Sequence, residues 1–193
     1  MDLINLSVVR QSFAQTVFTH QVQEIAAANK RKKVLWIKLS NVLIVSLILI
    51  LLGIQSQSPD RPIYSYLGAG LTIAEIVFLI IQLNFDFEGQ SLLHKNAALK
   101  YMGLRDRYRL LIADIMNSQA PKKEIIARRD SLQNEYQSIS DLAPNTGKKE
   151  YDAAQIALNK KGLVKGEQYT WSDKEIDHFL PEELRLSGKK SKS

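Results

Sequence analysis

The sequence predicts an all-α protein in which a two-helix transmembrane hairpin is continuous with a cytosolic helical bundle. The first observation is the distribution of charge: from Leu39 to Phe85 the 193-residue chain has only three charged residues, whereas the rest is charge-rich. The second is that apolar residues recur at helical spacing on both sides of that stretch, and no strand-like alternation of useful length appears. A plain soluble globule and a fully disordered chain are both excluded by this composition.

Two apolar stretches have the length of membrane-spanning helices. Val34–Ile54 and Ile63–Leu83 are 21 residues each, and the first contains one lysine. About 20 helical residues cross a hydrocarbon core of about 30 Å. The segment between them, QSQSPDRP, contains two prolines and cannot continue either helix. A secretory signal peptide is a poorer interpretation, because its apolar region would begin nearer the N-terminus and run only about 7–15 residues.

The basic residues predict the orientation of this hairpin. Four of them precede the first span and five follow the second, whereas the connecting loop has Arg61 alone. Because positively charged loops stay on the cytoplasmic side, we expect both termini in the cytoplasm and the protein in the inner membrane. The first group forms a basic anchor at the membrane surface, in contact with anionic lipid, and we expect no direct nucleic-acid binding. The two groups are Lys30, Arg31, Lys32 and Lys33, and Lys95, Lys100, Arg105, Arg107 and Arg109.

The second span carries a polar stripe around an acidic residue. A carboxylate near the middle of a span is costly, so Glu75 should face protein or water. The residues that share its sector of the helix are Ser65, Gly68, Thr72 and Gln82. Gly70 and Ala74 form a small-xxx-small pair that permits close helix packing. The stripe is either the seam of one hairpin, with Glu75 protonated or bonded to Ser46 or Asn41, or the lining of a pore built from several copies. A third interpretation is a proton-coupled transport carboxylate.

Four segments are expected along the chain: an N-terminal cytosolic amphipathic helix (1–33), the two-span hairpin (34–85), a cytosolic helical domain (86–187) and a disordered basic tail (188–193). The N-terminal helix should pack on the later domain rather than lie flat on the membrane. The helical domain should contain helices over 87–118, from Pro121 to before Ala143, over 148–161 with a glycine cap at Gly162, and a short helix after a Ser172/Glu175 capping box. The apolar side expected for the first of these includes Leu92, Leu99, Met102, Leu111 and Ile115.

No pattern of catalytic residues is present. The chain lacks cysteine, and His20, His94 and His178 are far apart, so we expect no metal, no cofactor and no enzymatic activity. Arg105 and Arg109 flank Asp106, which is typical of local ion pairs on a solvated face; a phosphate-binding pair is the alternative. Tyr169 and Trp171 are expected to anchor the final segment on the bundle, although aromatic side chains could also stack on a base.

The arrangement of two spans followed by ALKYMGLRDRYRLLIADI resembles the SLATT domains, two-span effectors of bacterial conflict systems. The ending SDKEIDHFLPEELR is similar to the branch found beside reverse-transcriptase-type defence genes. The resemblance implies an antiphage effector that a partner, a reverse transcriptase or a nucleotide-signal enzyme, triggers to form an oligomeric pore and halt the infected cell. It supplies no catalytic residues. It implies packing and coupling roles for Tyr101, Leu104, Arg105, Tyr108, Leu111 and Ile112.

Two other functions remain open on sequence grounds. A membrane-anchored scaffold would use the hairpin only as a tether, and its cytosolic helices would bind a partner. A small proton-coupled transporter would depend on the protonation of Glu75. The scaffold needs the second span only as an anchor, and the transporter needs a carboxyl group that can be protonated, whereas the pore needs a polar lining.

Overall fold

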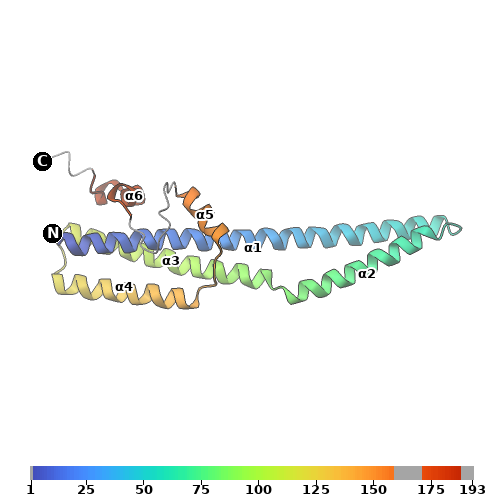
Figure 1. Cartoon of the computed structure of the whole chain (residues 1–193), viewed down its shortest axis with the longest axis horizontal. Helices are drawn as coiled ribbons and strands as arrows, with labels where there is room; N and C mark the ends of the chain where they lie inside the picture. The colour runs from blue at the N-terminus through green and yellow to red at the C-terminus, as the bar shows by residue number, and fades with distance from the viewer. Residues whose placement is uncertain (1, 159–170, 188–193) are drawn as a thin grey trace. The chain divides into compact units, whose positions relative to one another are not determined.

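A computed structural model describes residues 2–158 and 171–187, and within these ranges every regular element is helical, as the sequence predicts (Figure 1). The chain divides into two compact units. We call residues 28–92 the hairpin unit, and residues 1–27 with 93–193 the bundle unit. The elements are α1 (Leu3–Gln57), α2 (Ile63–Asn84), α3 (Phe87–Met116), α4 (Lys122–Leu142), α5 (Lys148–Ala157), α6 (Asp173–His178) and the 3-10 helix η1 (Glu182–Leu184).

The hairpin unit contains both expected spans. The later part of α1 and the whole of α2 are long and apolar enough to cross a membrane. None of the most apolar window of α1 is buried inside the protein, and only 11% of the corresponding window of the second stretch is buried. This exposure separates them from the core helices of a soluble protein, which are equally apolar but covered. The connecting turn occupies residues 58–62, since α1 continues to Gln57.

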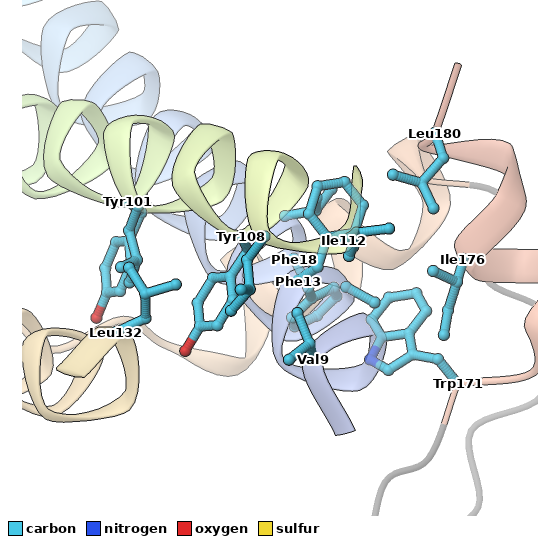
Figure 2. Packing of buried hydrophobic residues seen from close by; sticks show 14 of the residues in the cluster. Val9, Phe13, Phe18, Tyr101, Tyr108, Ile112, Leu132, Trp171, Ile176 and Leu180 are labelled. Atoms are coloured by element: carbon cyan, nitrogen blue, oxygen red, sulfur yellow. The ribbon is translucent and has the colours of Figure 1, made fainter. Parts of the chain in front are cut away.

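The bundle unit has one hydrophobic core, built from the first part of α1 and from α3, α4, α5 and the C-terminal segment. Figure 2 shows Val9, Phe13 and Phe18 from α1 meeting Tyr108 and Ile112 from α3. On α1, the expected apolar face is confirmed: Leu6, Val9, Phe13, Val17 and Val22 are buried, and Ile25 is partly buried. Its burial against the other helices supports packing on the later domain rather than on the membrane surface.

The apolar side predicted for the helix over 87–118 is only partly right. Leu111 and Ile115 are buried, but Leu92, Leu99 and Met102 are exposed. The core-facing side of α3 combines alanines and tyrosines with aliphatic residues: Ala97, Ala98, Tyr101, Leu104, Tyr108, Leu111 and Ile112. Alanine and tyrosine contribute little to a hydrophobicity pattern, so the bulky aliphatic residues on the other side of the helix misled the prediction.

The ends of the helices follow local rules. Ser118, with φ of 54°, takes the left-handed conformation just after α3, and Pro121 is the N-cap of α4 rather than its first residue. The predicted capping box is confirmed, because Ser172 Oγ accepts from Glu175 N–H and Ser172 N–H donates to Glu175 Oε2. The helix expected over 148–161 is described to Ala157. Gly162, Tyr169 and the tail over 188–193 lie outside the described ranges.

Candidate functional site

The polar stripe of α2 divides between two environments. Gly68 and Glu75 are the two buried residues of α2, and Gln82 is half-buried. A Cβ placed on Gly68 would lie 4.0 Å from Leu51 Cβ and from Leu52 Cδ2 of α1. The Gly68 side of the helix therefore faces α1, and this contact surface between α1 and α2 is called the seam below.

Glu75 lies in this seam. Its exposed fraction is 6%, and its Oε2 atom is buried without a hydrogen-bond partner. The two expected partners are engaged elsewhere: Ser46 Oγ donates to the carbonyl of Val42 (2.7 Å), and Asn41 pairs with Gln82. A buried polar oxygen with no donor costs free energy in any apolar surrounding. Glu75 is thus held in the hairpin without the compensation that a buried carboxyl group normally has.

Asn41 and Gln82 form a reciprocal amide pair between the two spans. Asn41 Nδ2 donates to Gln82 Oε1 (3.1 Å), and Gln82 Nε2 donates to Asn41 Oδ1 (2.8 Å). Each amide satisfies one donor and one acceptor of the other, which an apolar surrounding cannot do. This pair fixes the register of α1 against α2 at the end of the hairpin that α3 follows.

We expect Gln82→Leu to weaken the hairpin more than the double replacement Asn41→Leu with Gln82→Leu. The single change leaves the amide of Asn41 without its partner, whereas the double change removes both polar groups. The coupling free energy between the two sites should be about 0.6–2 kcal/mol, the range of hydrogen bonds between membrane helices. Steric-trap or denaturant unfolding in bicelles measures it. Strictly additive effects would contradict a pairwise contact.

The other residues of the predicted stripe and the small-xxx-small pair have exposed side chains, although the backbone N–H of Ser65 donates to Gln55 Oε1 of α1 (3.0 Å). Ser65 and Thr72 are exposed, and Thr72 Oγ1 donates to the carbonyl of Gly68 (2.9 Å). Gly70 and Ala74 are also exposed, and a Cβ on Gly70 would have nothing within 4 Å. The structure therefore separates the predicted stripe into a seam group (Gly68, Glu75, Gln82) and an exposed group (Ser65, Thr72), with the small-xxx-small pair uncovered.

The predicted basic anchor surrounds the start of α3 within the hairpin unit. Lys30 Nζ donates to Gln90 Oε1 (2.5 Å), and the ammonium groups of Lys30 and Lys33 lie 5.6 and 5.5 Å from the ring centroid of Phe87. Arg31 and Lys32 are exposed. The cluster thus combines cation–π contacts with free positive charge beside the spans, the arrangement that attracts anionic lipid head groups.

The coupling residues expected on α3 are core residues of the bundle unit. Tyr101, Leu104 and Tyr108 are at most 1% exposed. Tyr101 Oη is 2.9 Å from Ser140 Oγ of α4, and burial raises the pKa of Tyr108 to about 12. Their burial across α1, α3 and α4 makes them packing residues of this core.

The two arginines of the same helix form the expected local ion pairs. Arg105 is partly exposed and donates to the carboxylate of Asp106 (3.0 and 3.1 Å), which also lies 3.7 Å from Arg109. Both guanidinium groups therefore share an acidic partner. That geometry favours the solvated ion-pair interpretation over a phosphate-binding pair.

The histidines are dispersed, and no group of acidic or histidine side chains that could hold a metal ion is found in the described parts of the chain. His94 is buried with Nδ1 2.6 Å from Gln23 Oε1. Burial, together with the nearby charge of Arg105, lowers the pKa of His20. His94 of α3 thus contacts α1, and His20 of α1 lies close enough to Arg105 of α3 to be affected by its charge.

A buried ion pair is the main feature that sequence reasoning missed. Arg10 is fully buried, and its Nη2 lies 2.6 Å from Asp177 Oδ1. Burial alone raises the pKa of Asp177, but hydrogen bonds from Ser187 and Arg10 outweigh it and bring the pKa to about 2. One sequence signal was available: on a helical wheel Arg10 lies beside Val17, at the edge of the apolar face formed by Leu6, Val9, Phe13 and Val17.

Comparison with known proteins now identifies the class. Residues 6–175 match the family described as "SMODS and SLOG-associating 2TM effector domain family 4". This match covers most of the chain, so the chain belongs to that family, and the predicted SLATT resemblance is confirmed. A reverse-transcriptase branch is not addressed by the match and stays a prediction. No curated protein and no solved structure matches the chain.

Family and fold together define a two-transmembrane membrane protein, an effector of conflict systems. The two candidate spans of the hairpin unit agree with the "2TM" of the family description. The family is not a known enzymatic one. The family description does not say how the effector acts on the membrane or what activates it.

Proposed function

We propose that the protein is the membrane effector of a bacterial antiphage system, and that several copies assemble into a pore in the inner membrane when a partner triggers them. Loss of the membrane barrier then halts the infected cell. Both termini are proposed to lie in the cytoplasm. The lining is proposed to come from the polar residues of α2: Ser65, Gly68, Thr72, Glu75 and Gln82.

The observation that carries this proposal is the state of Glu75. In a single hairpin its carboxyl group is buried in the seam and its Oε2 atom has no hydrogen-bond partner. Water would satisfy that oxygen, and a polar group in the membrane is stabilised when it faces a water-filled cavity. One hairpin of two helices has too little surface to enclose such a cavity. Assembly of several hairpins, with α1 and α2 repacked, therefore relieves a cost that the single copy bears.

The exposed group supports the same proposal. Ser65 and Thr72 already lie on the outer surface of the hairpin, on the edge of the seam, and Gly70 with Ala74 offers an uncovered small-residue face. Small residues allow membrane helices to approach closely. A turn of α2 about its axis would bring Glu75 beside Thr72 at a central axis, while the small-residue face contacts a neighbouring copy.

The trigger is proposed to be a partner protein, either a reverse transcriptase or an enzyme that makes a nucleotide signal. The family description itself names association with SMODS and SLOG. The bundle unit is the proposed site of contact, because it forms the part of the chain outside the spans. Such gating requires two states whose equilibrium the partner shifts.

Ion leakage from liposomes tests the pore. We expect the purified protein to release an entrapped dye or ion, and Glu75→Leu and Thr72→Leu to reduce the rate. A barrier higher by ~1.4 kcal/mol for the permeating ion lowers the flux about tenfold. The matched control is Ile76→Leu, at the exposed neighbour of Glu75. Unchanged leakage in both Glu75→Leu and Thr72→Leu would remove these residues from the lining.

Glu75→Gln separates the pore from a proton-coupled carrier. A pore needs a polar group at this position, so the amide should conduct, although with altered ion selectivity. A carrier needs a group that binds and releases a proton, so the amide should abolish transport. Activity that follows pH in the wild type and disappears in Glu75→Gln would favour the carrier.

A membrane-anchored scaffold is the second candidate, and the Asn41–Gln82 pair favours it. This pair satisfies two polar side chains of the spans within one copy, as expected of a hairpin that serves only as a tether. Replacement of both spans by an unrelated hairpin distinguishes the two functions. A scaffold keeps its defence activity after the exchange, whereas a pore loses it.

A further inference from the structure

The C-terminal segment from Trp171 to Ser187 docks on the first part of α1 through three apolar anchors. Trp171, Ile176 and Leu180 are each at most 4% exposed and belong to the same core cluster as Val9 and Phe13 of α1. Figure 2 shows Trp171, Ile176 and Leu180 grouped at one end of this cluster, near Phe13 and Phe18. The Trp171 ring lies 6.0 Å from that of Phe18, between ring centroids. The segment therefore covers a surface of α1 that would otherwise be apolar and exposed.

The docking is centred on the buried ion pair. The Arg10 guanidinium contacts Asp177 Oδ1 (2.6 Å) and donates to the carbonyls of Leu184 (3.2 Å) and Asp173 (3.4 Å). Asp177 in turn accepts from the backbone N–H groups of Leu186 and Ser187 and from the Ser187 hydroxyl. Through Arg10 and Asp177, the ion pair thus contacts the segment at Asp173, Leu184, Leu186 and Ser187. Removal of either residue leaves the charge of the other residue buried without its partner.

A second polar contact fixes where the segment begins. Gln11 Nε2 donates to the carbonyl of Trp171 (2.6 Å), and Gln11 Oε1 accepts from its N–H (2.8 Å). Arg10 and Gln11 are adjacent in sequence, so two consecutive residues of α1 recognise the start and the middle of the segment. The docking thus includes directional polar contacts in addition to the burial of apolar surface.

The segment is suited to leave this surface. Its only α-helix, α6, has six residues, and so short a helix is not stable in isolation. Its structure therefore depends on docking, which gives two states, docked and released. The family match ends at residue 175, so Ile176, Asp177 and Leu180 lie beyond the matched effector domain, whereas Arg10 lies within it. The surface it covers belongs to α1, which is assigned as one helix from Leu3 to Gln57 and includes the first span.

We propose that the segment Trp171–Ser187 is an autoinhibitory clamp: docked on α1 through Arg10, Gln11 and the apolar anchors, it keeps the effector inactive, and its release permits assembly. This inference rests on the proposed pore and names its regulation. Release uncovers the apolar surface around Val9, Phe13 and Phe18, which another copy of the chain then covers in the assembly. The clamp inhibits through non-covalent contacts, and no covalent step is involved.

The experiment measures docking and leakage separately in the full-length protein. The chain has two tryptophans, so in a Trp36→Phe background the fluorescence of Trp171 alone reports docking. We expect Asp177→Asn and Ile176→Asp to shift this emission to longer wavelength and to raise the rate of liposome leakage. If the released state is populated at ~1–10% in the wild type, the increase is about ten- to a hundredfold.

Asp173→Asn is the matched control. Asp173 lies 3.6 Å from the same guanidinium, but its side chain is 63% exposed, so its loss should change neither the fluorescence nor the leakage. A synthetic peptide of residues 171–187 added to the Asp177→Asn protein should lower its leakage. The same peptide carrying Asn at position 177 should not.

Each result has a distinct meaning. Release of the segment in Asp177→Asn or Ile176→Asp with wild-type leakage would overturn the clamp and leave the pore standing. Release with no leakage from any variant or from the wild type would overturn the proposed pore itself, and the docking data would still describe the segment. Leakage that rises in Asp173→Asn as much as in Asp177→Asn would also overturn the clamp, because the effect would then not come from the buried pair.

Discussion

Replacement of Arg10 by alanine is expected to lower the free energy of unfolding of the bundle unit by about 3–5 kcal/mol. The guanidinium is fully buried, and its removal leaves Asp177, 3% exposed, without the charge that compensates it. The carbonyls of Leu184 and Asp173 lose a donor as well. A loss of this size is large relative to the total stability of a domain, about 5–15 kcal/mol.

Chemical denaturation followed by circular dichroism in detergent measures this loss. Arg10→Met combined with Asp177→Leu should be less destabilising than either single change, because the double variant removes both buried charges. The pair of Lys122 with Asp2 (3.9 Å), in which the lysine is exposed, provides the control, and Lys122→Ala should leave the stability close to that of the wild type. A loss of below about 1 kcal/mol for Arg10→Ala would show that water compensates Asp177.

The dependence of the free energy of unfolding on acidic pH provides a second measurement of the same ion pair. The pKa of Asp177 is lowered to about 2 from its ordinary 3.8, so its stabilising contribution is complete above pH 4 and is lost as the pH falls through about 2. Arg10→Ala removes one of the contacts that lower this pKa. The loss should therefore be smaller in the variant and should be complete at a higher pH than in the wild type, although it begins near pH 4 in both proteins.

The hairpin could be predicted from sequence because its signal is local and strong. The chain has two apolar runs with the length of a span and a break that contains proline between them. In a helical protein, few structures other than a transmembrane hairpin accommodate this pattern. The face of α1 that enters the bundle was also readable, since bulky apolar residues recur there at helical spacing. On α3 the same reasoning failed, because alanines and tyrosines form the buried side and Leu99 and Met102 do not.

The contacts that matter most at the candidate sites could not be predicted in the same way. Arg10 and Asp177 are 167 residues apart, and Asn41 and Gln82 are 41 apart. No local rule relates such positions, because their pairing depends on how the helices pack. The sequence does show a charged residue at the edge of an apolar face, at Arg10, and another within a membrane span, at Glu75. The sequence therefore identifies which residues need a polar or charged partner, but it does not identify the partner residue.

Glu75 relates the two interpretations of the polar stripe. In the single copy its side chain is buried against α1, as the seam interpretation expects. The bonds expected to Ser46 or Asn41 are replaced by an oxygen without a partner. The pore interpretation concerns the assembled state, in which the same oxygen would meet water. The two interpretations thus describe two states of one hairpin, which is what the proposed triggering needs.

Moving the basic anchor to the other side of the hairpin is expected to invert the protein in the membrane. The variant replaces Lys30, Arg31, Lys32 and Lys33 with glutamine and places lysine at Gln55, Gln57 and Ser58. Lysine and arginine close to the ends of a span resist translocation, and the first helix usually determines the orientation. The charges that follow α2 oppose inversion, so we expect a mixed population in which the inverted form predominates.

Fusions at the C-terminus measure the orientation: a fluorescent protein reports the cytoplasm, and alkaline phosphatase reports the periplasm. The wild type should give fluorescence and no phosphatase activity. A charge-conserving exchange of Lys30→Arg, Arg31→Lys, Lys32→Arg and Lys33→Arg should behave like the wild type, because the orientation depends on positive charge and not on side-chain shape. Phosphatase activity in the wild type would place the bundle unit, and with it the Arg10 clamp, on the side of the membrane where no cytoplasmic sensor could reach it.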